Sequence, residues 1–252
     1  MPAGNPVVAN GAARVVEYFR KRVLSGELKV GDRLPPERDL CVLLGISRPS
    51  LREGLKALSV LGVIESHQGR GAFVGEANAA VLGDALSFSL AQQPNVIEDV
   101  LQVRMAIECQ AIRLACRAAS DADLAEISRR LEVFVDSLQD PERGGGADHA
   151  FHLALVEASH SPSLVAVYRT LEPLLLRSHV NRRQLVAADL SVTSSLVQAH
   201  KDILVAVMNG DLEEAERCLR GHFEIGARMR RDRFIASVRD IGVAAGTPVA
   251  SV

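Results

Sequence analysis

The sequence predicts a mainly α-helical chain with two domains, and three observations lead to this fold class. The first is a series of signals between Gly31 and Val74, in the order turn, short helix, break, second helix and hairpin. The second is that the sizeable segments from Val96 to about Arg239 all have helical spacing of apolar residues, with short loops and no strand alternation. The third is composition, because hydrophobic residues make up 48% of the chain, aromatic residues only 4%, and Trp is absent. We therefore expect a small N-terminal domain followed by an all-α antiparallel bundle of six or seven helices, with Ala, Leu and Val filling the core.

Breaks in these patterns divide the chain into parts. Residues 1–9 contain two Pro and a Gly and are expected to form a loose tail. The expected parts after it are a head at 10–75, a linker at 76–95, a helical body at 96–238 and a disordered tail at 239–252.

The head is built around the stretch from Gly31 to Val74. After a first helix at 10–25, the expected elements are a turn at 31–36, a helix at 37–44, a break at Gly45, a helix at 47–61, and two short strands at 63–65 and 72–74. Helix, tight turn, helix and hairpin is the order of a winged helix-turn-helix, a DNA-binding fold with a small β wing.

The second helix of this motif has two distinct faces. Leu51, Leu55 and Leu58 recur at helical spacing and form an apolar face, and Ser47 or Ser50 can cap the start. A cationic face is formed by Arg48, Arg52 and Lys56. Such a helix suits insertion into a DNA major groove. The alternative is a solvated face on an ordinary helix, but the preceding turn and helix and the following hairpin favour DNA.

Charge is distributed unevenly along the chain. The whole chain has 29 Lys and Arg against 31 Asp and Glu, whereas residues 1–75 hold 11 basic and 7 acidic residues. A basic head on an acidic body is expected of a DNA-reading domain joined to a domain that does not bind DNA. No uncharged apolar run reaches the length of about 18 residues that a membrane span needs, and no signal-peptide pattern is found, so we expect a cytoplasmic protein. Free thiols are expected at the widely separated Cys41, Cys109, Cys116 and Cys218.

The body is expected to consist of helices joined by short loops. After a connecting helix at 80–90, the predicted helices are 97–119, 122–139, 147–159, 163–184, 192–209 and a last one from 212 toward 237. Asp121 and Asp211 are the expected caps of two of them, and residues 141–146 are expected to form a turn.

Four polar residues of the body form a candidate metal site. Asp148 and His152 are four positions apart, so their side chains share one helix face, and His200 and His222 lie in two further helices. Three imidazoles and one carboxylate, all pointing inward, would suit a metal ion of borderline-soft character. The alternative is that each His is a hydrogen-bonded core residue.

Arg104 is a second candidate in the body. It lies mid-helix among apolar residues, where an unpaired cation is costly. Either it pairs with Glu108 one turn further on, or it faces a cavity and binds an anion, because a guanidinium can hold a carboxylate at two points.

The motifs of the head resemble those of the GntR superfamily of bacterial regulators over about residues 10–75. The matching pieces are Leu34-Pro35-Pro36-Glu37-Arg38-Asp39-Leu40, Gly45-Ile46-Ser47-Arg48, Leu51-Arg52-Glu53 and Gly69-Arg70-Gly71. The resemblance implies DNA contacts from Arg38, Ser47, Arg48, Ser50 and Arg52, and from the wing residues Gln68, Gly69 and Arg70. The chain departs from the pattern at Cys41 and at Gly54, where Gly in a helix costs about 1 kcal/mol relative to Ala.

Residues 96–236 resemble the FCD domain, the ligand-binding body of the FadR-type subfamily. The matching pieces are Val103-Arg104 with Glu108, Asp148-His149-Ala150-Phe151-His152, His200-Lys201-Asp202-Ile203 ahead of Asn209-Gly210-Asp211, and His222-Phe223. In metal-binding members an Asp and three His are the ligands, which implies these roles for Asp148, His152, His200 and His222. The resemblance also favours Arg104 as the anion-binding residue. Solvent or packing roles are expected for His67, His149, His160 and His179, and a place in the cavity lining is open for Arg177 and Asn181.

Taken together, these features predict a DNA-binding transcriptional regulator rather than an enzyme. We expect a homodimer on a palindromic operator, because one head covers only a half-site. The body would bind a divalent metal, with zinc expected first and nickel or manganese also suitable, and a small organic acid such as lactate, a sugar acid or a dicarboxylate. Release of DNA on ligand binding is the commoner arrangement in similar proteins, so we expect a repressor. The alternatives are the same regulator with a metal-free acyl-type ligand, and a metal-dependent enzyme.

Overall fold

The computed structural model describes residues 11–93, 95–186 and 189–244. The chain divides into two compact units, Met1–Ala85, which contains the head, and Leu86–Val252, which contains the body. The tail expected at 1–9 lies outside the described residues, as does the part of the expected C-terminal tail beyond residue 244.

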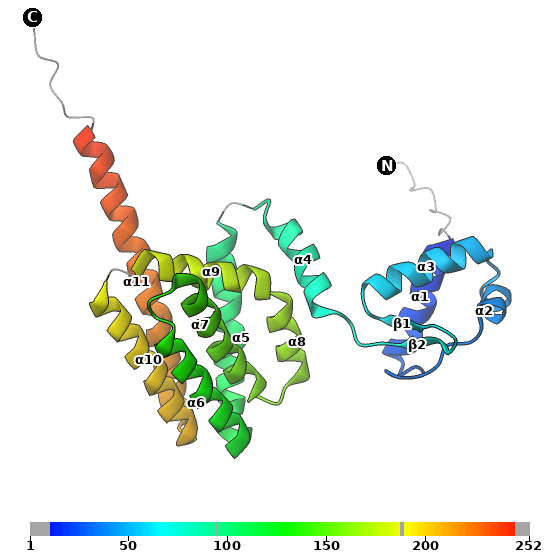
Figure 1. Ribbon diagram of the computed structural model, residues 1–252, viewed down its shortest axis with the longest axis horizontal. Coiled ribbons are helices and arrows are strands. Elements are labelled where there is room, and N and C mark those ends of the chain that lie inside the picture. Colours follow the sequence, from blue (N-terminus) through cyan, green and yellow to red (C-terminus); the bar gives the residue numbers. More distant parts are fainter. Residues whose placement is uncertain (1–10, 94, 187–188, 245–252) are drawn as a thin grey trace, which may run out of the picture. The chain divides into compact units, whose positions relative to one another are not determined.

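The described residues of the head form three helices and a small antiparallel sheet (Figure 1). These elements are α1 (Gly11–Leu24), α2 (Glu37–Leu44), α3 (Arg48–Val60), β1 (Ile64–His67) and β2 (Gly71–Val74). The strands pair from Ile64 opposite Val74 to His67 opposite Gly71. The head core is formed by Val15, Phe19, Leu34, Leu40, Leu51, Leu58, Ile64 and Val74. The predicted winged helix-turn-helix is therefore confirmed.

Local chemistry fixes the start and the packing of α3. The Ser47 hydroxyl accepts a hydrogen bond from the Ser50 N–H at 3.4 Å, which caps the helix. Gly54 packs directly on α1, where an added Cβ would lie 2.6 Å from the Val15 Cβ and 2.9 Å from the Ala12 carbonyl oxygen. The low helix propensity of Gly54 is therefore offset by the close approach of α1 and α3 that it permits.

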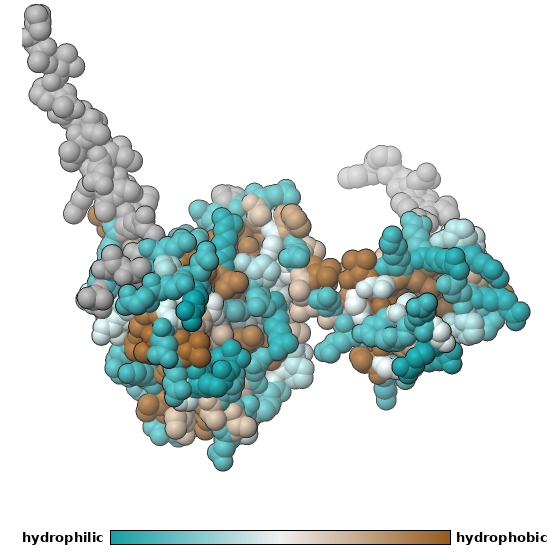
Figure 2. Space-filling view, in the orientation of Figure 1, coloured by the Kyte–Doolittle hydropathy of each residue, from teal (hydrophilic) through white to brown (hydrophobic). Residues whose placement is uncertain are grey.

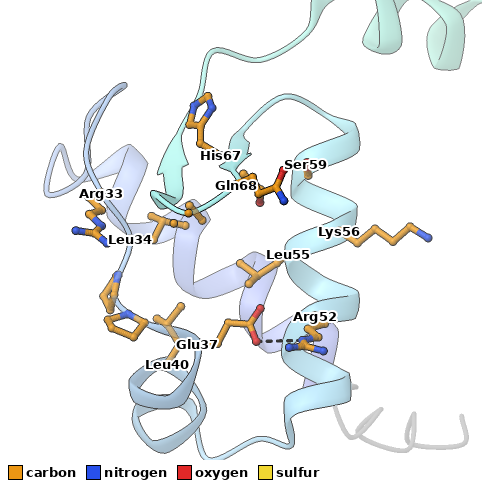
Figure 3. A pocket seen from close by; sticks show the side chains of 16 residues that line it. Arg33, Leu34, Glu37, Leu40, Arg52, Leu55, Lys56, Ser59, His67 and Gln68 are labelled. Carbon is orange, nitrogen blue, oxygen red and sulfur yellow. Dashed lines mark hydrogen bonds and ion pairs between the residues drawn. The ribbon is translucent and has the colours of Figure 1, made fainter.

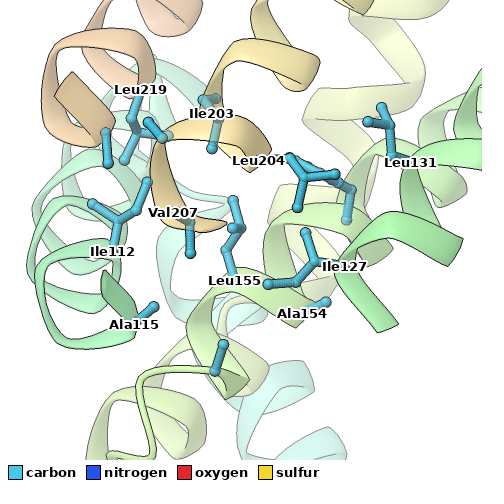
Figure 4. Close-up of a cluster of buried hydrophobic side chains, with 14 of the residues drawn as sticks. Ile112, Ala115, Ile127, Leu131, Ala154, Leu155, Ile203, Leu204, Val207 and Leu219 are labelled. Carbon is cyan, nitrogen blue, oxygen red and sulfur yellow. The ribbon is translucent and has the colours of Figure 1, made fainter. Parts of the chain in front are cut away.

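The body is an all-helical unit, reached through α4 (Ala79–Leu90). Its described helices are α5 (Val96–Ala118), α6 (Asp121–Asp136), α7 (Pro141–Glu157), α8 (Pro162–Thr170), α9 (Glu172–Val186), α10 (Leu190–Met208) and α11 (Leu212–Ala244). The main core lies among α5, α6, α7, α10 and α11 (Figure 4), and a smaller apolar cluster surrounds Tyr168. Among the described residues the body thus has seven helices, within the predicted number.

The start of α7 differs from the sequence prediction. Residues 141–146, which were expected to form a turn, are the first turns of α7, and Asp140 caps them by accepting from the Glu142 and Arg143 N–H groups. The three consecutive glycines suggested a loop, but Gly145 packs on α9, where a Cβ would lie 2.7 Å from the Val180 Cα. Gly145 therefore serves the close packing of α7 on α9.

Three further boundaries differ. Ser120, and not Asp121, caps α6 through a reciprocal capping box with Asp123. The single helix expected at 163–184 is divided into α8 and α9 near Pro173. The backbone of 239–244, which was expected to be disordered, continues α11.

No helix in the described part of the chain combines the length and the apolar character needed to cross a membrane. On the face drawn in Figure 2, hydrophilic residues cover most of the head, as the charge distribution of the sequence indicates.

Candidate metal centre and DNA interface

The four predicted metal ligands converge in the body. Asp148 and His152 come from one face of α7, His200 from α10 and His222 from α11, and all four side chains are fully buried. One ligand atom from each of them can be chosen so that all four lie within 4.8 Å of one another. The distances from the Asp148 Oδ1 to the Nε2 atoms of His152 and His200 are both 3.4 Å.

Hydrogen bonds outside the cluster orient two of these imidazoles. The Nδ1 of His152 lies 2.8 Å from the Glu108 Oε2, and the Nδ1 of His200 lies 2.7 Å from the Leu196 carbonyl oxygen. Both partners accept, so each Nδ1 donates the proton of its bond, and in the neutral ring the Nε2 is the nitrogen that keeps a lone pair. A ligating His is commonly oriented in this way by a carboxylate or a carbonyl group.

The cluster lacks internal hydrogen-bond partners for several of its nitrogens. The Nε2 of His152 and both ring nitrogens of His222 are buried and unpaired among the described residues. Burial lowers the pKa of His200 and takes that of His222 well below its ordinary value, which favours the neutral form of both rings. Burial opposes ionisation of Asp148, but the Arg182 charge holds the pKa of this carboxyl well below its usual range. One anionic oxygen ligand and neutral imidazoles with free lone pairs fit a divalent cation.

Arg104 is paired with Glu108, the first of the two arrangements that the sequence allowed. Its Nε lies 2.6 Å from the Glu108 Oε1, which also accepts from the Tyr168 hydroxyl at 2.7 Å. Burial and the Arg104 charge act on Glu108 in opposite directions, and the net result is a lowered pKa. The Arg104 Nη2 is buried and has no partner among the described residues, so one donor of this guanidinium is still available.

Two residues of α9 that the sequence did not assign to the site lie against Asp148. The Nδ1 of His179, for which a solvent or packing role was expected, lies 3.1 Å from the Asp148 Oδ1, and the Arg182 Nη2 lies 2.5 Å from the Oδ2. Their spacing of three places both on one face of α9, which is the signal that could have linked them. Of the other His, His149 is buried beside Tyr168, and its ring nitrogens have no hydrogen-bond partner among the described residues, the Glu172 Oε1 lying 3.7 Å from its Nε2.

The predicted DNA contacts lie on the surface of the head. Ser50 is half-buried because it lies against the first residue of α1, and the exposed ones are Arg38, Ser47, Arg48, Arg52, Gln68, Gly69 and Arg70. Arg52, Gln68 and Gly69 line a common groove of about 1140 Å³ between α3 and the wing (Figure 3). The other five are not in its lining. His67, for which a solvent or packing role was expected, does line the groove.

One ion pair crosses this groove. The Arg52 Nε lies 3.0 Å from the Glu37 Oε2 at the start of α2, and both side chains are largely exposed. Figure 3 shows this contact and the Lys56 side chain extending away from the helix. The pair holds the Arg52 guanidinium at the groove between α3 and the wing.

Comparison with known proteins agrees with this architecture. Residues 12–74 match the family described as bacterial regulatory proteins, gntR family, and residues 99–225 match the FCD domain. This chain belongs to the GntR family and carries an FCD domain. The resemblance predicted from the motifs is thus confirmed, and this GntR protein is a DNA-binding transcriptional regulator, not an enzyme.

Relatives of this GntR protein include regulators from two bacteria. The Glc operon transcriptional activator of Escherichia coli K12 is 37% identical over 169 residues, which are 65% of this chain and 66% of that protein. The HTH-type transcriptional regulator LutR of Bacillus subtilis is 31% identical over 201 residues, covering 79% of this chain and 92% of LutR. A solved structure described as Streptococcus agalactiae GntR covers 87% of this chain with a TM-score of 0.62 and 20% identity, which shows the shared fold.

Proposed function

We propose that the body of this regulator holds a divalent metal ion on Asp148, His152, His200 and His222, and that a small carboxylate bound there changes the affinity of the head for operator DNA. The observation that carries the proposal is the buried convergence of these four side chains with unpaired ring nitrogens. Leaving such nitrogens unpaired in the protein interior is costly, and a bound metal removes that cost.

The metal would supply open coordination positions for the oxygen atoms of an acid. Zinc suits a centre with three nitrogen ligands and one oxygen ligand, and nickel or manganese is also compatible with it. The unpaired Nη2 of Arg104 supplies a donor for the same carboxylate. Of this chain's own residues, Glu108 orients His152, and the Leu196 carbonyl orients His200.

On the DNA side, α3 enters the major groove and the wing lies along the backbone. Arg52 and Arg48 read base edges, and the remaining contacts come from Arg38, Ser47, Ser50, Gln68, Gly69 and Arg70. A homodimer would place two heads on a palindromic operator in the cytoplasm. We expect repression that the acid relieves, although the activator among the relatives shows that the opposite sign occurs in similar proteins.

Metal analysis of protein purified without chelator tests the proposal. The wild-type chain should contain close to one equivalent of metal, and His152→Ala should contain less than about one tenth of an equivalent, because a ligand is lost. His160→Ala is the matched control, because His160 is half-exposed and pairs with Asp123 outside the cluster. A metal-free wild type would favour the metal-free acyl-type ligand.

A further inference from the structure

A pocket of about 390 Å³ lies in the body at the junction of α5, α9 and α11. Its lining includes Leu101, Ser178, Arg182, Gly226 and Arg230. Figure 1 shows α9 crossing the bundle close to α5 and α11. A pocket of this size suits a small molecule rather than a macromolecule.

This pocket is next to the metal cluster along the helices. Gly226 follows His222 by four residues on α11, and Leu101 precedes Arg104 by three on α5. At a rise of 1.5 Å per residue, the four residues from His222 to Gly226 correspond to about 6 Å along the axis of α11. The pocket and the metal cluster are therefore about 6 Å apart along this helix. Arg182 belongs to both, because it lines the pocket while its Nη2 donates to Asp148.

Two guanidinium groups converge in the pocket. The Nη1 atoms of Arg230 and Arg182 lie 3.5 and 3.7 Å from the point where a Cβ on Gly226 would stand. The Arg182 Nε is buried and has no hydrogen-bond partner in the part of the chain that the structure describes. The acid paired with Arg230 is distant, since the Arg230 Nε lies 3.9 Å from the Oε1 of a largely exposed Glu98. The pocket therefore offers convergent donors that the protein does not use.

The charge of the region also favours an anionic ligand. Among the described residues, the charged groups that are buried around the cluster or line the pocket are Arg104, Arg182, Arg183 and Arg230 against Glu98, Glu108 and Asp148. A divalent ion raises the excess of positive charge from one to three, and a ligand with two negative charges brings it back to one. Burial and the charge of Arg182 lower the pKa of Arg230, against the opposing charge of Glu98.

We propose that Arg182 and Arg230 form a second carboxylate subsite, about one helical turn from the metal, and that the acid which this regulator senses is a dicarboxylate. This inference rests on the proposed function, in which the metal and Arg104 take the first carboxylate. A separation of about 6 Å between the two subsites corresponds to an acid of about four to six carbons, given carbon–carbon bonds of about 1.5 Å. Arg182 links the second subsite to the metal through Asp148.

Calorimetric titration of the zinc-loaded full chain with matched acids tests this inference. The probes are glutarate against pentanoate and succinate against butanoate, so that each pair has the same number of carbons. The wild type should bind the diacid at least about tenfold more tightly than the matched monoacid, because charged hydrogen bonds are the strong ones. Arg182→Gln and Arg230→Gln should each reduce that ratio to about twofold or less.

Two further variants keep the outcome interpretable. Arg177→Gln is the control, because Arg177 is an exposed residue of the same helix outside the pocket lining, and it should keep the wild-type ratio. Gly226→Ala should fold well, since the atoms nearest its Cβ, on Arg230 and Arg182, are at ordinary contact distance, yet the Cβ takes up space between the two guanidiniums and should also lower the ratio. Circular dichroism checks the fold of every variant.

The outcomes separate this inference from the function on which it rests. Binding of monoacids and diacids with equal affinity, or a diacid preference that survives in both Gln variants and in Gly226→Ala, would overturn the second subsite and leave acid sensing intact. If no acid binds to the zinc-loaded wild type, acid sensing itself is wrong, and the second subsite is lost with it.

Discussion

Glu108 is hydrogen-bonded to three side chains of the body, although it is not itself one of the proposed metal ligands and is buried. Its carboxylate accepts from Arg104 and Tyr168 on one oxygen and from His152 on the other, and it is 1% exposed. The buried charge of Arg104 is thus neutralised by the same group that orients a metal ligand. The stability of the body and the geometry of the metal site therefore depend on one residue.

Glu108→Gln tests this double role. Loss of the charge leaves Arg104 uncompensated, which should destabilise the body by about 3–5 kcal/mol, and should weaken metal binding about 10–100-fold. Chemical denaturation and competition with a chelator measure the two effects. Glu126→Gln is the control, because that partly exposed Glu pairs with Arg129 and Arg130 at the surface, and its loss should cost at most about 1 kcal/mol. Unchanged metal affinity in Glu108→Gln would contradict the orienting role.

Residues of α3 should determine operator affinity. Arg48→Ala and Arg52→Ala should each weaken binding by about 1–3 kcal/mol, as expected for arginines that read base edges. Fluorescence anisotropy at several salt concentrations measures the loss. Arg129→Ala, an exposed substitution in the body, should leave the affinity unchanged. Operator affinity that survives both head substitutions would rule out α3 as the reading helix.

The sequence predicts that two site residues lie together when they have helical spacing on one helix. It does not predict the proximity of residues that are brought together only where two helices cross. The four-residue spacing of Asp148 and His152 predicts a shared face, and the buried cluster is found where that spacing indicated. His179 and Arg182 reach Asp148 only because α9 crosses α7 at close range. Single-helix periodicity does not contain that information.

At the scale of elements, Gly145 permits the close contact of α7 with α9. An added Cβ on Gly145 would lie 2.7 Å from both the Cα and the Cγ2 of Val180, whereas nothing lies within 4 Å of one on Gly146. A Cβ at position 145 of α7 would therefore collide with Val180, whereas position 146 has room for one.

The matched substitutions Gly145→Ala and Gly146→Ala test this packing. Gly145→Ala should destabilise the body by about 1–3 kcal/mol because it overpacks the contact with α9. Gly146→Ala should stabilise it by up to about 1 kcal/mol through helix propensity alone. Thermal and urea unfolding measure both. Equal effects of the two variants would show that α7 and α9 do not approach as closely as described.

The elements themselves were largely predictable, and the errors have a common cause. The hairpin, α3 and most helices of the body follow from periodicity and caps. Residues 141–146 differ from the prediction because glycine indicates a loop when its spatial neighbours are unknown. The end of the last helix was likewise placed too early, because an Ala- and Gly-rich composition alone does not distinguish helix from tail.

At the scale of the whole molecule, the metal is expected to contribute to stability as well as to sensing. Binding of an ion to the folded state alone stabilises it by about 2.7 kcal/mol when the free ion is at 100 times its dissociation constant. Chelation should therefore lower the melting temperature of the wild-type body, and His222→Ala should no longer respond to chelation. Scanning calorimetry with and without chelator makes the comparison.

Operator affinity measured across metal and acid conditions tests the central claim most directly. The full chain is titrated onto its operator in four states: zinc-loaded or chelated, each with and without a small carboxylate that binds the protein. A coupling of about 1–3 kcal/mol between two sites predicts that the acid changes operator affinity about 5–150-fold in the zinc-loaded state and not in the chelated state. An operator affinity that stays the same in all four states would contradict the account.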